Sequence, residues 1–302
     1  MVIIIPTCQR GALLERTLQC LVDADMPDCV KRVVVVENGK KEGAESKCEG
    51  FRDKLPLEYL YTPIGSKSAA LNLVLESCDG EFVVFFDDDV RIDPGCIRAY
   101  ADASAGKTGG EFYAGKCNID YDVAPPEWLK HYLPYSAKGW SYGDEICDLP
   151  EPLALGFNWA AFADDLKKAG SFNSDIGPGR LISIGEETDL QKIMLENGVK
   201  GVYLPDGLVW HHVPADRCSL SWTLERNRRM GLLVGRKLAA APAPKRLGKS
   251  FVAMAKVLGL GILANAGRAF LSDAKRFHYL QRRHWNLGIL QGQQPAEDGK
   301  QF

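Results

Sequence analysis

Residues 81–90, EFVVFFDDDV, join a continuous apolar run directly to three consecutive aspartates. β-Branched and aromatic residues favour strands, and an unbroken apolar run is typical of a strand that is covered on both faces of its sheet. Glu81 to Phe86 is therefore predicted to be a buried strand whose carboxyl end carries the three acids, Asp87, Asp88 and Asp89. In open α/β sheets, ligands bind at that edge.

Asp87 and Asp89 are spaced i and i+2, so in an extended chain their side chains would point from the same side. An acidic pair beside an apolar core is costly unless a cation offsets it, and carboxylates are ligands that hard divalent cations prefer. We therefore expect the pair to hold one metal ion. A solvated loop with a helix cap is the alternative; it accounts for Asp93 before Pro94 but not for three acids directly after Phe86.

Strand-like and helix-like segments alternate through the first half of the chain. This repetition, with short connections, predicts an α/β fold with a mostly parallel, doubly wound sheet. Polar residues follow the predicted strands and should converge on one crevice. The expected strands are residues 2–6, 33–37, 57–61 and 81–86, and the expected helices lie around 13–21, 66–78, 164–169 and 186–197, with short strands at 201–205 and 207–212.

Composition is that of a soluble globular protein, with 46% hydrophobic and 25% charged residues in 302. The nine cysteines show no paired metal-ligand spacing, and the apolar run before Pro6 has no basic segment ahead of it, unlike a secretory leader. We expect a reducing, cytoplasmic location.

Charge is distributed very unevenly. Residues 221–302 hold 15 Lys and Arg against 4 Asp and Glu, a net +11, so the whole-chain totals of 37 and 39 leave 22 minus 35, or −13, for residues 1–220. A basic region of this kind suggests a polyanionic partner, either a nucleic acid or an anionic membrane surface.

Near Lys275 and Arg276, cations alternate with aromatic residues, the combination expected at a lipid surface. We therefore expect peripheral contact with the inner face of the membrane, and a nucleic acid is the less favoured partner. The alternatives are helices that pack on the catalytic body or form an oligomer contact. The uncharged run 257–267 is only eleven residues long, which by itself predicts a segment too short to span a bilayer.

Six motifs, taken in order, are IIIPTCQR, VVVVENG, KSAALN, FFDDDV, GEETDL and VWHHVP. This ordered set resembles the inverting family 2 glycosyltransferases with the GT-A fold, over about residues 1–215. The resemblance implies a GT-A (Rossmann-like) catalytic domain at 1–219, with a donor half at 1–117 and an acceptor half at 118–219, followed by a helical basic region at 220–302. It also implies sugar transfer from a nucleotide-diphosphate donor to a hydroxyl acceptor. The basic C-terminal region, in turn, leads us to expect a saccharide or lipid-linked acceptor and a role in glycolipid or polysaccharide synthesis.

The resemblance implies roles for individual residues as well. Mg²⁺ or Mn²⁺ would be held by Asp87 and Asp89, with His211 as a further ligand or neighbour. The ion is physically reasonable because carboxylates alone would repel a diphosphate, and a bridging cation inverts that sign. The positions that match the nucleotide-sugar pocket are Thr7, Arg10, Glu37, Asn38, Lys67, Asn72, Asp87 and Asp88.

Glu186 and Glu187, in GEETDL, stand where the family usually has Glu-Asp. Inverting transfer needs a general base that takes the proton of the acceptor hydroxyl. By register Glu187 has the place of the base, and Glu186 is the alternative. An acidic first helical turn that stabilises the helix dipole would also explain these acids.

Three tryptophans, Trp128, Trp140 and Trp159, are candidates to stack on an acceptor sugar, and they are equally suited to a core. Two other classes of protein remain open. One is a catalytically silent sugar-nucleotide-binding scaffold, because Glu-Glu replaces Glu-Asp. The other is a nucleotidyltransferase, although PTCQRG contains only one glycine and so lacks the usual Gly-rich loop of that class.

Overall fold

The computed structural model describes residues 1–149, 151, 154–174 and 185–294. The chain forms two compact units. Unit 1 contains residues 1–120 and 138–212, and unit 2 contains residues 121–137 and 213–302. These units differ from the boundary expected at residue 219, because residues 121–137 group with the C-terminal helices.

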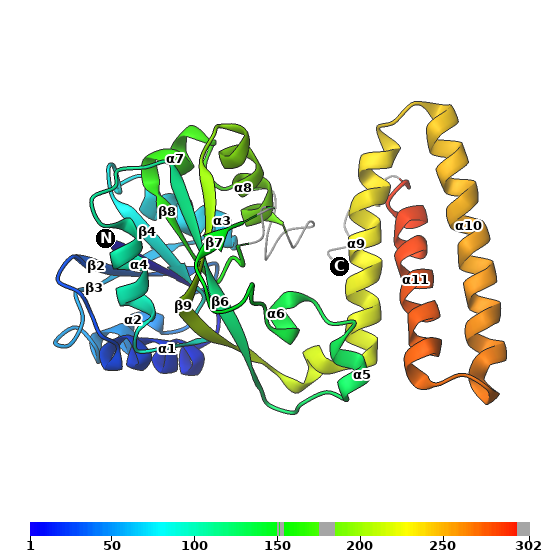
Figure 1. The fold of residues 1–302 in the computed structure, drawn as a ribbon, viewed down its shortest axis with the longest axis horizontal. Helices are drawn as coiled ribbons and strands as arrows, with labels where there is room; N and C mark the ends of the chain where they lie inside the picture. The colour runs from blue at the N-terminus through cyan, green and yellow to red at the C-terminus, as the bar shows by residue number, and fades with distance from the viewer. Residues whose placement is uncertain (150, 152–153, 175–184, 295–302) are drawn as a thin grey trace. The chain divides into compact units, whose positions relative to one another are not determined.

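Unit 1 is built on one sheet with the strand order β3-β2-β1-β4-β8-β6-β9-β5, and β7 pairs with β9 (Figure 1). The first four strands are β1 (Val2–Thr7), β2 (Arg32–Asn38), β3 (Leu57–Thr62) and β4 (Phe82–Phe86), and they pair in parallel. β8 runs antiparallel to β4, and β6 runs antiparallel to β8. The remaining strands are β5 (Val90–Ile92), β6 (Glu111–Tyr121), β7 (Cys147–Asp148), β8 (Asn158–Phe162) and β9 (Lys200–Val213).

Helices make the connections between the parallel strands. Since α1 leads from β1 to β2 and α2 from β2 to β3, the chain moves outward over one face, and α3 returns it to β4 on the other side of β1. This reversal creates a topological switch point between the carboxyl ends of β1 and β4, where open α/β sheets bind ligands. The helices of unit 1 are α1 (Gly11–Asp23), α2 (Ala44–Glu49), α3 (Lys67–Leu75), α4 (Cys96–Ser104), α7 (Ala163–Lys168) and α8 (Glu186–Glu196), and α6 (Tyr135–Lys138) crosses the boundary from unit 2 into unit 1.

The apolar runs of the sequence form the centre of the sheet. Every residue of β1 and β4 is buried, as expected for strands that are covered on both faces. Across the sheet, Phe85 of β4 stacks on Trp159 of β8, with ring centroids 4.8 Å apart. The predicted α/β class, with a mostly parallel central sheet flanked by helices, is confirmed.

Unit 2 consists mainly of three long helices, in which α11 contacts both α9 and α10 (Figure 1). Glycines allow α9 and α11 to approach closely: a Cβ on Gly231 would lie 2.0 Å from the Trp285 carbonyl oxygen, and one on Gly288 would lie 1.9 Å from the Arg228 carbonyl oxygen. The helical C-terminal region is therefore confirmed. Its elements are α5 (Glu127–Lys130), η1 (Ala215–Cys218), α9 (Leu220–Ala239), α10 (Ala243–Ala266), η2 (Gly267–Ala269) and α11 (Asp273–Gln291).

The length argument against a membrane span is wrong. The uncharged run belongs to α10, which has 24 residues, and among the described helices it is the one that is long and apolar enough to cross a membrane by length and composition. The helix is longer than the uncharged run because Lys256 does not interrupt it. Core helices of soluble proteins can also meet this criterion, but such helices are mostly buried. In α10, only 17% of the most apolar 18-residue stretch is buried.

Candidate active site

The carboxyl ends of β1 and β4 meet through a hydrogen bond between their side chains. Thr7 Oγ1 donates to Asp88 Oδ2 at 2.7 Å, and Arg10, directly before α1, donates through Nη1 to Asp88 Oδ1 at 3.2 Å and to Asp89 Oδ2 at 2.6 Å. Residues distant in sequence therefore form one polar cluster at the switch point, as predicted.

The three aspartates, here called the acidic turn, do not continue the strand. Asp88 and Asp89 lie in a turn between β4 and β5, so the expectation that Asp87 and Asp89 point from one side of an extended chain is wrong. Thr17 of α1 holds this turn, because its hydroxyl contacts the carbonyl oxygens of Asp88 at 3.0 Å and Val90 at 2.8 Å. Thr17 was not anticipated from the sequence, since a buried threonine on a helix has no local signal for this role.

Each carboxylate of the acidic turn has a basic neighbour. Lys67, at the start of α3, places Nζ 2.5 Å from Asp87 Oδ1, and His211 of β9 places Nε2 3.5 Å from Asp89 Oδ1. The His211 ring stacks on Phe157, with centroids 4.3 Å apart and an interplanar angle of 15°. His211 therefore lies beside a predicted metal ligand. Lys67, which was expected beside the diphosphate, binds a carboxylate here.

Burial dominates the electrostatics of the acidic turn. It raises the pKa of Asp88 to about 6, although Arg10 and Thr7 act in the opposite direction. Burial also raises the pKa of Asp87; the Lys67 charge opposes this shift and the Asp89 charge adds to it. The ionised form of the buried carboxylates is therefore energetically unfavourable, and an additional cation beside them would stabilise it.

Glu37 and Asn38 are the last two residues of β2, the strand next to β1. Glu37 is buried, and it accepts hydrogen bonds from the Tyr59 hydroxyl at 2.5 Å and from the Glu42 backbone amide at 2.6 Å. Asn38 Nδ2 donates to the Thr7 carbonyl oxygen at 3.0 Å. Both residues thus order the strand ends that border the crevice, and direct contact with a nucleotide remains a prediction.

Asn72 is engaged by backbone at both ends of its amide. Its Nδ2 donates to the Phe172 carbonyl oxygen at 2.8 Å, and its Oδ1 accepts from the Phe172 amide at 3.0 Å. The side chain fixes the segment after α7 to α3. Its predicted place in the nucleotide-sugar pocket stays a prediction, with one amide hydrogen and one oxygen lone pair beyond these two bonds.

Gly156 connects the acidic turn to the predicted base. Its carbonyl oxygen accepts a hydrogen bond from Lys67 Nζ at 3.1 Å, and a Cβ on Gly156 would lie 2.6 Å from Glu187 Oε1. Glu187 Oε2 is buried and has no hydrogen-bond partner among the described residues. Glu187 therefore lies beside the residue that binds Lys67, with one carboxylate oxygen available.

Gln191, one turn further along α8, fixes this arrangement. It accepts from the Ala154 amide at 3.0 Å and donates to the Ala154 carbonyl oxygen at 2.9 Å, so α8 is held to the segment that contains Gly156. Neither Gly156 nor Gln191 was anticipated. The only sequence signal was an isolated glycine before a buried strand, which often marks close backbone approach. The side chain of Glu186 lies outside the described residues.

The tryptophans are placed differently from the expectation. Trp159 is fully buried in β8 against Phe85, and Trp140 is buried against Tyr203 of β9, with centroids 5.3 Å apart. Both are core residues, so the prediction that they stack on an acceptor is wrong. Trp128 belongs to unit 2, where it packs on Phe277 with centroids 5.6 Å apart, and its role with an acceptor stays a prediction.

Across the part of the chain that the structure describes, no group of three or more His, Cys, Asp or Glu side chains is arranged to hold a metal ion by itself. His211 contacts Asp89, and the charges of both residues act on Asp87: Asp89 raises the pKa of Asp87 and His211 lowers it. Two carboxylates can suffice for Mg²⁺ or Mn²⁺ when substrate phosphates supply further oxygen ligands.

The fold matches that of solved GT-A glycosyltransferases. Residues 2–144, slightly less than half of the chain, match the model of glycosyl transferase family 2, so the resemblance drawn from the sequence motifs is confirmed.

Among curated proteins, the succinoglycan biosynthesis protein ExoM of Rhizobium meliloti is 28% identical over 295 residues, which cover 95% of this chain and 90% of ExoM. Among solved structures, the mannosyltransferase PcManGT from Pyrobaculum calidifontis, in complex with GDP-Man and Mn²⁺, has a TM-score of 0.59 at 18% identity and covers 95% of this chain and 85% of its own. TarS of S. aureus, in complex with UDP-GlcNAc, has a TM-score of 0.55 at 14% identity and covers 96% and 90%. At these identities, the structural likeness establishes the fold alone.

Proposed function

We propose that this glycosyltransferase is metal-dependent and inverting, and that it moves a sugar from a nucleotide-diphosphate donor to a hydroxyl acceptor in glycolipid or polysaccharide synthesis. One observation carries the proposal: the acidic turn, Lys67 and Glu187 gather around Gly156 at the switch point of the sheet. Relatives support it as well, since one acts in succinoglycan biosynthesis and one structural neighbour binds GDP-Man with Mn²⁺.

The residues present fit a divalent ion. Asp87 and Asp89 would hold it, with His211 beside Asp89, because carboxylate and imidazole groups are hard or borderline ligands. Burial raises the pKa of Asp87, so a cation beside it would stabilise its ionised form. When bound, the ion would supply positive charge to the leaving diphosphate.

Lys67 and Arg10 would add positive charge at the same edge. In the structure each is paired with an aspartate, Lys67 with Asp87 and Arg10 with Asp88 and Asp89. We infer that these cations exchange carboxylate for phosphate oxygens when the donor binds, since both ligands are anionic oxygens and guanidinium and ammonium groups bind either.

Glu187 would act as the general base. Its unpartnered Oε2 can accept a hydrogen bond from the acceptor hydroxyl, and it would take that proton as the hydroxyl oxygen attacks the anomeric carbon and the diphosphate leaves on the opposite side. Glu187 in place of the family's usual Asp is one methylene longer, and its contact with Gly156 sets how far it reaches.

The experiment that tests this function is nucleotide release from a panel of sugar nucleotides, with Mn²⁺ and with the ion removed by chelation. We expect one or a few donors to release nucleotide only when the ion is present. Release that is unaffected by chelation would contradict metal dependence, and the configuration of a transferred sugar, read by NMR, would decide between inversion and retention.

A silent sugar-nucleotide-binding protein is the second candidate, because Glu stands in the position usually held by Asp. Calorimetric donor binding without hydrolysis or transfer would favour it.

A cytoplasmic location and peripheral membrane contact of unit 2 belong to the proposed glycosyltransferase function. The basic charge of residues 221–302 supports contact with an anionic membrane surface.

A further inference from the structure

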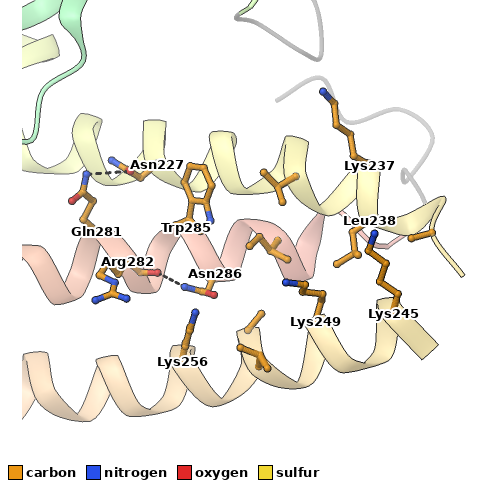
Figure 2. A pocket seen from close by; sticks show the side chains of 15 residues that line it. Asn227, Lys237, Leu238, Lys245, Lys249, Lys256, Gln281, Arg282, Trp285 and Asn286 are labelled. Carbon is orange, nitrogen blue, oxygen red and sulfur yellow. Dashed lines mark hydrogen bonds between the residues drawn. The ribbon is translucent and has the colours of Figure 1, made fainter. Parts of the chain in front are cut away.

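Unit 2 contains a cavity of about 690 Å³ among α9, α10 and α11, here called the lysine cleft (Figure 2). Its size lies within the range of about 300–1,000 Å³ that is typical of ligand sites. All three helices contribute lining residues. The lining cations are Lys237, Lys245, Lys249, Lys256 and Arg282, and among the described residues no acid lines the cleft.

The cations that line the lysine cleft form no salt bridge with any described residue. The basic residues around the acidic turn, in contrast, are paired with aspartates. On α10, Lys249 and Lys256 are seven residues apart, so they lie on one face of the helix, and Figure 2 shows both pointing toward α11. Like charges held together without an acidic partner repel one another, so a bound anion would stabilise this arrangement.

Apolar side chains line much of the same cleft. Val234 and Leu238 of α9, Val252 of α10 and Ile289 of α11 contribute to it, together with the Trp285 ring. A phosphate ion alone would leave this apolar surface in water. An anion that carries an aliphatic chain would cover it.

The opposite face of α10 is also apolar and is exposed. Leu247, Phe251, Leu258 and Ile262 form a stripe at helical spacing and are 66%, 77%, 61% and 67% exposed. Phe251 and Leu258 follow Lys249 and Lys256 by two residues, so they lie about 200° around the helix from the lysines, and Leu247 and Ile262 lie on the same side as them, because each residue turns the helix by about 100°. Extended exposed apolar stripes mark protein or membrane contacts, and combined with the lysines this one favours a lipid environment.

We propose that the lysine cleft binds the phosphate-bearing head group of a lipid, with the lysines on the phosphate and the first part of the chain on the apolar side chains. This site is separate from the sugar-transfer residues, and the proposal does not depend on the reaction proposed above. A nucleic acid is the less suitable ligand, because it offers phosphates but no aliphatic chain for the apolar lining.

The test is calorimetric binding to the full chain of inorganic phosphate, butyl phosphate, octyl phosphate and uncharged octyl glucoside, all below their micelle concentrations. Octyl phosphate should bind at least about tenfold more tightly than butyl phosphate, since each buried methylene contributes up to about fourfold. It should also bind more tightly than octyl glucoside. Inorganic phosphate that binds as tightly as octyl phosphate would overturn the proposal and indicate a free-anion site.

Paired variants locate the site. Lys249→Gln with Lys256→Gln should weaken octyl phosphate binding about tenfold or more. The matched control, Lys54→Gln with Arg246→Gln, removes the same charge from exposed positions outside the lining and should change binding little. Because all four side chains are exposed, unchanged melting curves should confirm that both proteins fold. Equal weakening by both pairs would overturn the proposal.

Two further measurements separate the sources of phosphate. Vesicles of phosphatidylcholine with added phosphatidic acid should carry the wild-type chain in flotation, and the Lys249/Lys256 variant should remain largely unbound. A single-stranded oligonucleotide should not displace octyl phosphate at equal phosphate concentration. Displacement by the oligonucleotide, or flotation that does not depend on the two lysines, would contradict a lipid head group in this cleft.

Discussion

The acidic turn of unit 1 and the lysine cleft of unit 2 carry opposite charge, and they hold it in opposite ways. The carboxylates of the acidic turn are largely buried, and each has a basic neighbour from another element. The lysines of the cleft are exposed, and no described acid pairs with them. At the acidic turn, a ligand must replace an existing ion-pair partner. At the lysine cleft, an anionic ligand can bind without displacing a described residue.

This difference predicts different responses to substitution. Truncation of one member of a buried ion-paired cluster leaves its partners without compensation, so effects should be large. Removal of one exposed lysine leaves the others in water, so effects should be moderate and sensitive to salt.

The largest effect is expected for Asp89→Ala. It removes a proposed metal ligand and the carboxylate that both Arg10 and His211 contact, so metal-dependent nucleotide release should fall by about 10³-fold. The Lys249→Gln/Lys256→Gln chain is the control and should keep its release of nucleotide from a soluble donor. Similar losses in both variants would break the distinction between the two regions.

Glu187→Gln should be next in size. The amide cannot accept the acceptor proton, so turnover should fall about 10²- to 10³-fold while calorimetric donor affinity changes little. If Glu186→Gln causes that loss and Glu187→Gln does not, the two glutamates exchange roles.

Gly156→Ala should lower turnover about 10²-fold, because the new methyl group would displace the Glu187 carboxylate or the backbone that accepts from Lys67. The matched control is Gly50→Ala, whose Cβ would meet only the Lys47 carbonyl oxygen, at an ordinary 3.6 Å. Full activity of Gly156→Ala would refute the packing between Gly156 and Glu187.

The smallest effect concerns Asp88 in metal-free protein. Its pKa is about 6 when folded and 3.8 otherwise, so the folded state holds the proton more tightly and loses stability as pH rises from about 4 to 6. Relative to Asp88→Asn, the wild type should lose about 1–3 kcal/mol over that range, measured by urea unfolding in a chelator. A constant difference between the two proteins would contradict the buried charge.

Much of the fold followed from the sequence, because β1, β2 and β4 are continuous apolar runs that suit only a strand buried on both faces. The antiparallel part was not specified: β8 pairs with β4 across 71 residues between Phe86 and Asn158, and no local pattern encodes such a partner. The wrong prediction for Trp159 has the same cause. Without knowledge of the strand pairing, an aromatic residue in a short apolar segment suits a hydrophobic core and a sugar-stacking surface equally.

The site was predictable in its chemistry but less so in its geometry. Asp87 and Asp89 were found from their position after a strand, whereas the turn that carries them depends on Thr17, a tertiary contact. Gly156 has no side chain and so gives no chemical signal; its importance lies in what approaches it. The lysine cleft depends on the close packing of α9 and α11 at Gly231 and Gly288, which residue spacing alone does not reveal.

The most direct test of the central claim is calorimetric titration of a nucleoside diphosphate into the full chain, with and without Mn²⁺, compared with the Asp87→Asn/Asp89→Asn variant. If the acidic turn holds an ion that is shared with the diphosphate, Mn²⁺ should strengthen binding to the wild type by about tenfold or more and should not strengthen binding to the variant. Binding to the wild type that Mn²⁺ does not change, or an equal gain in the variant, would contradict the claim.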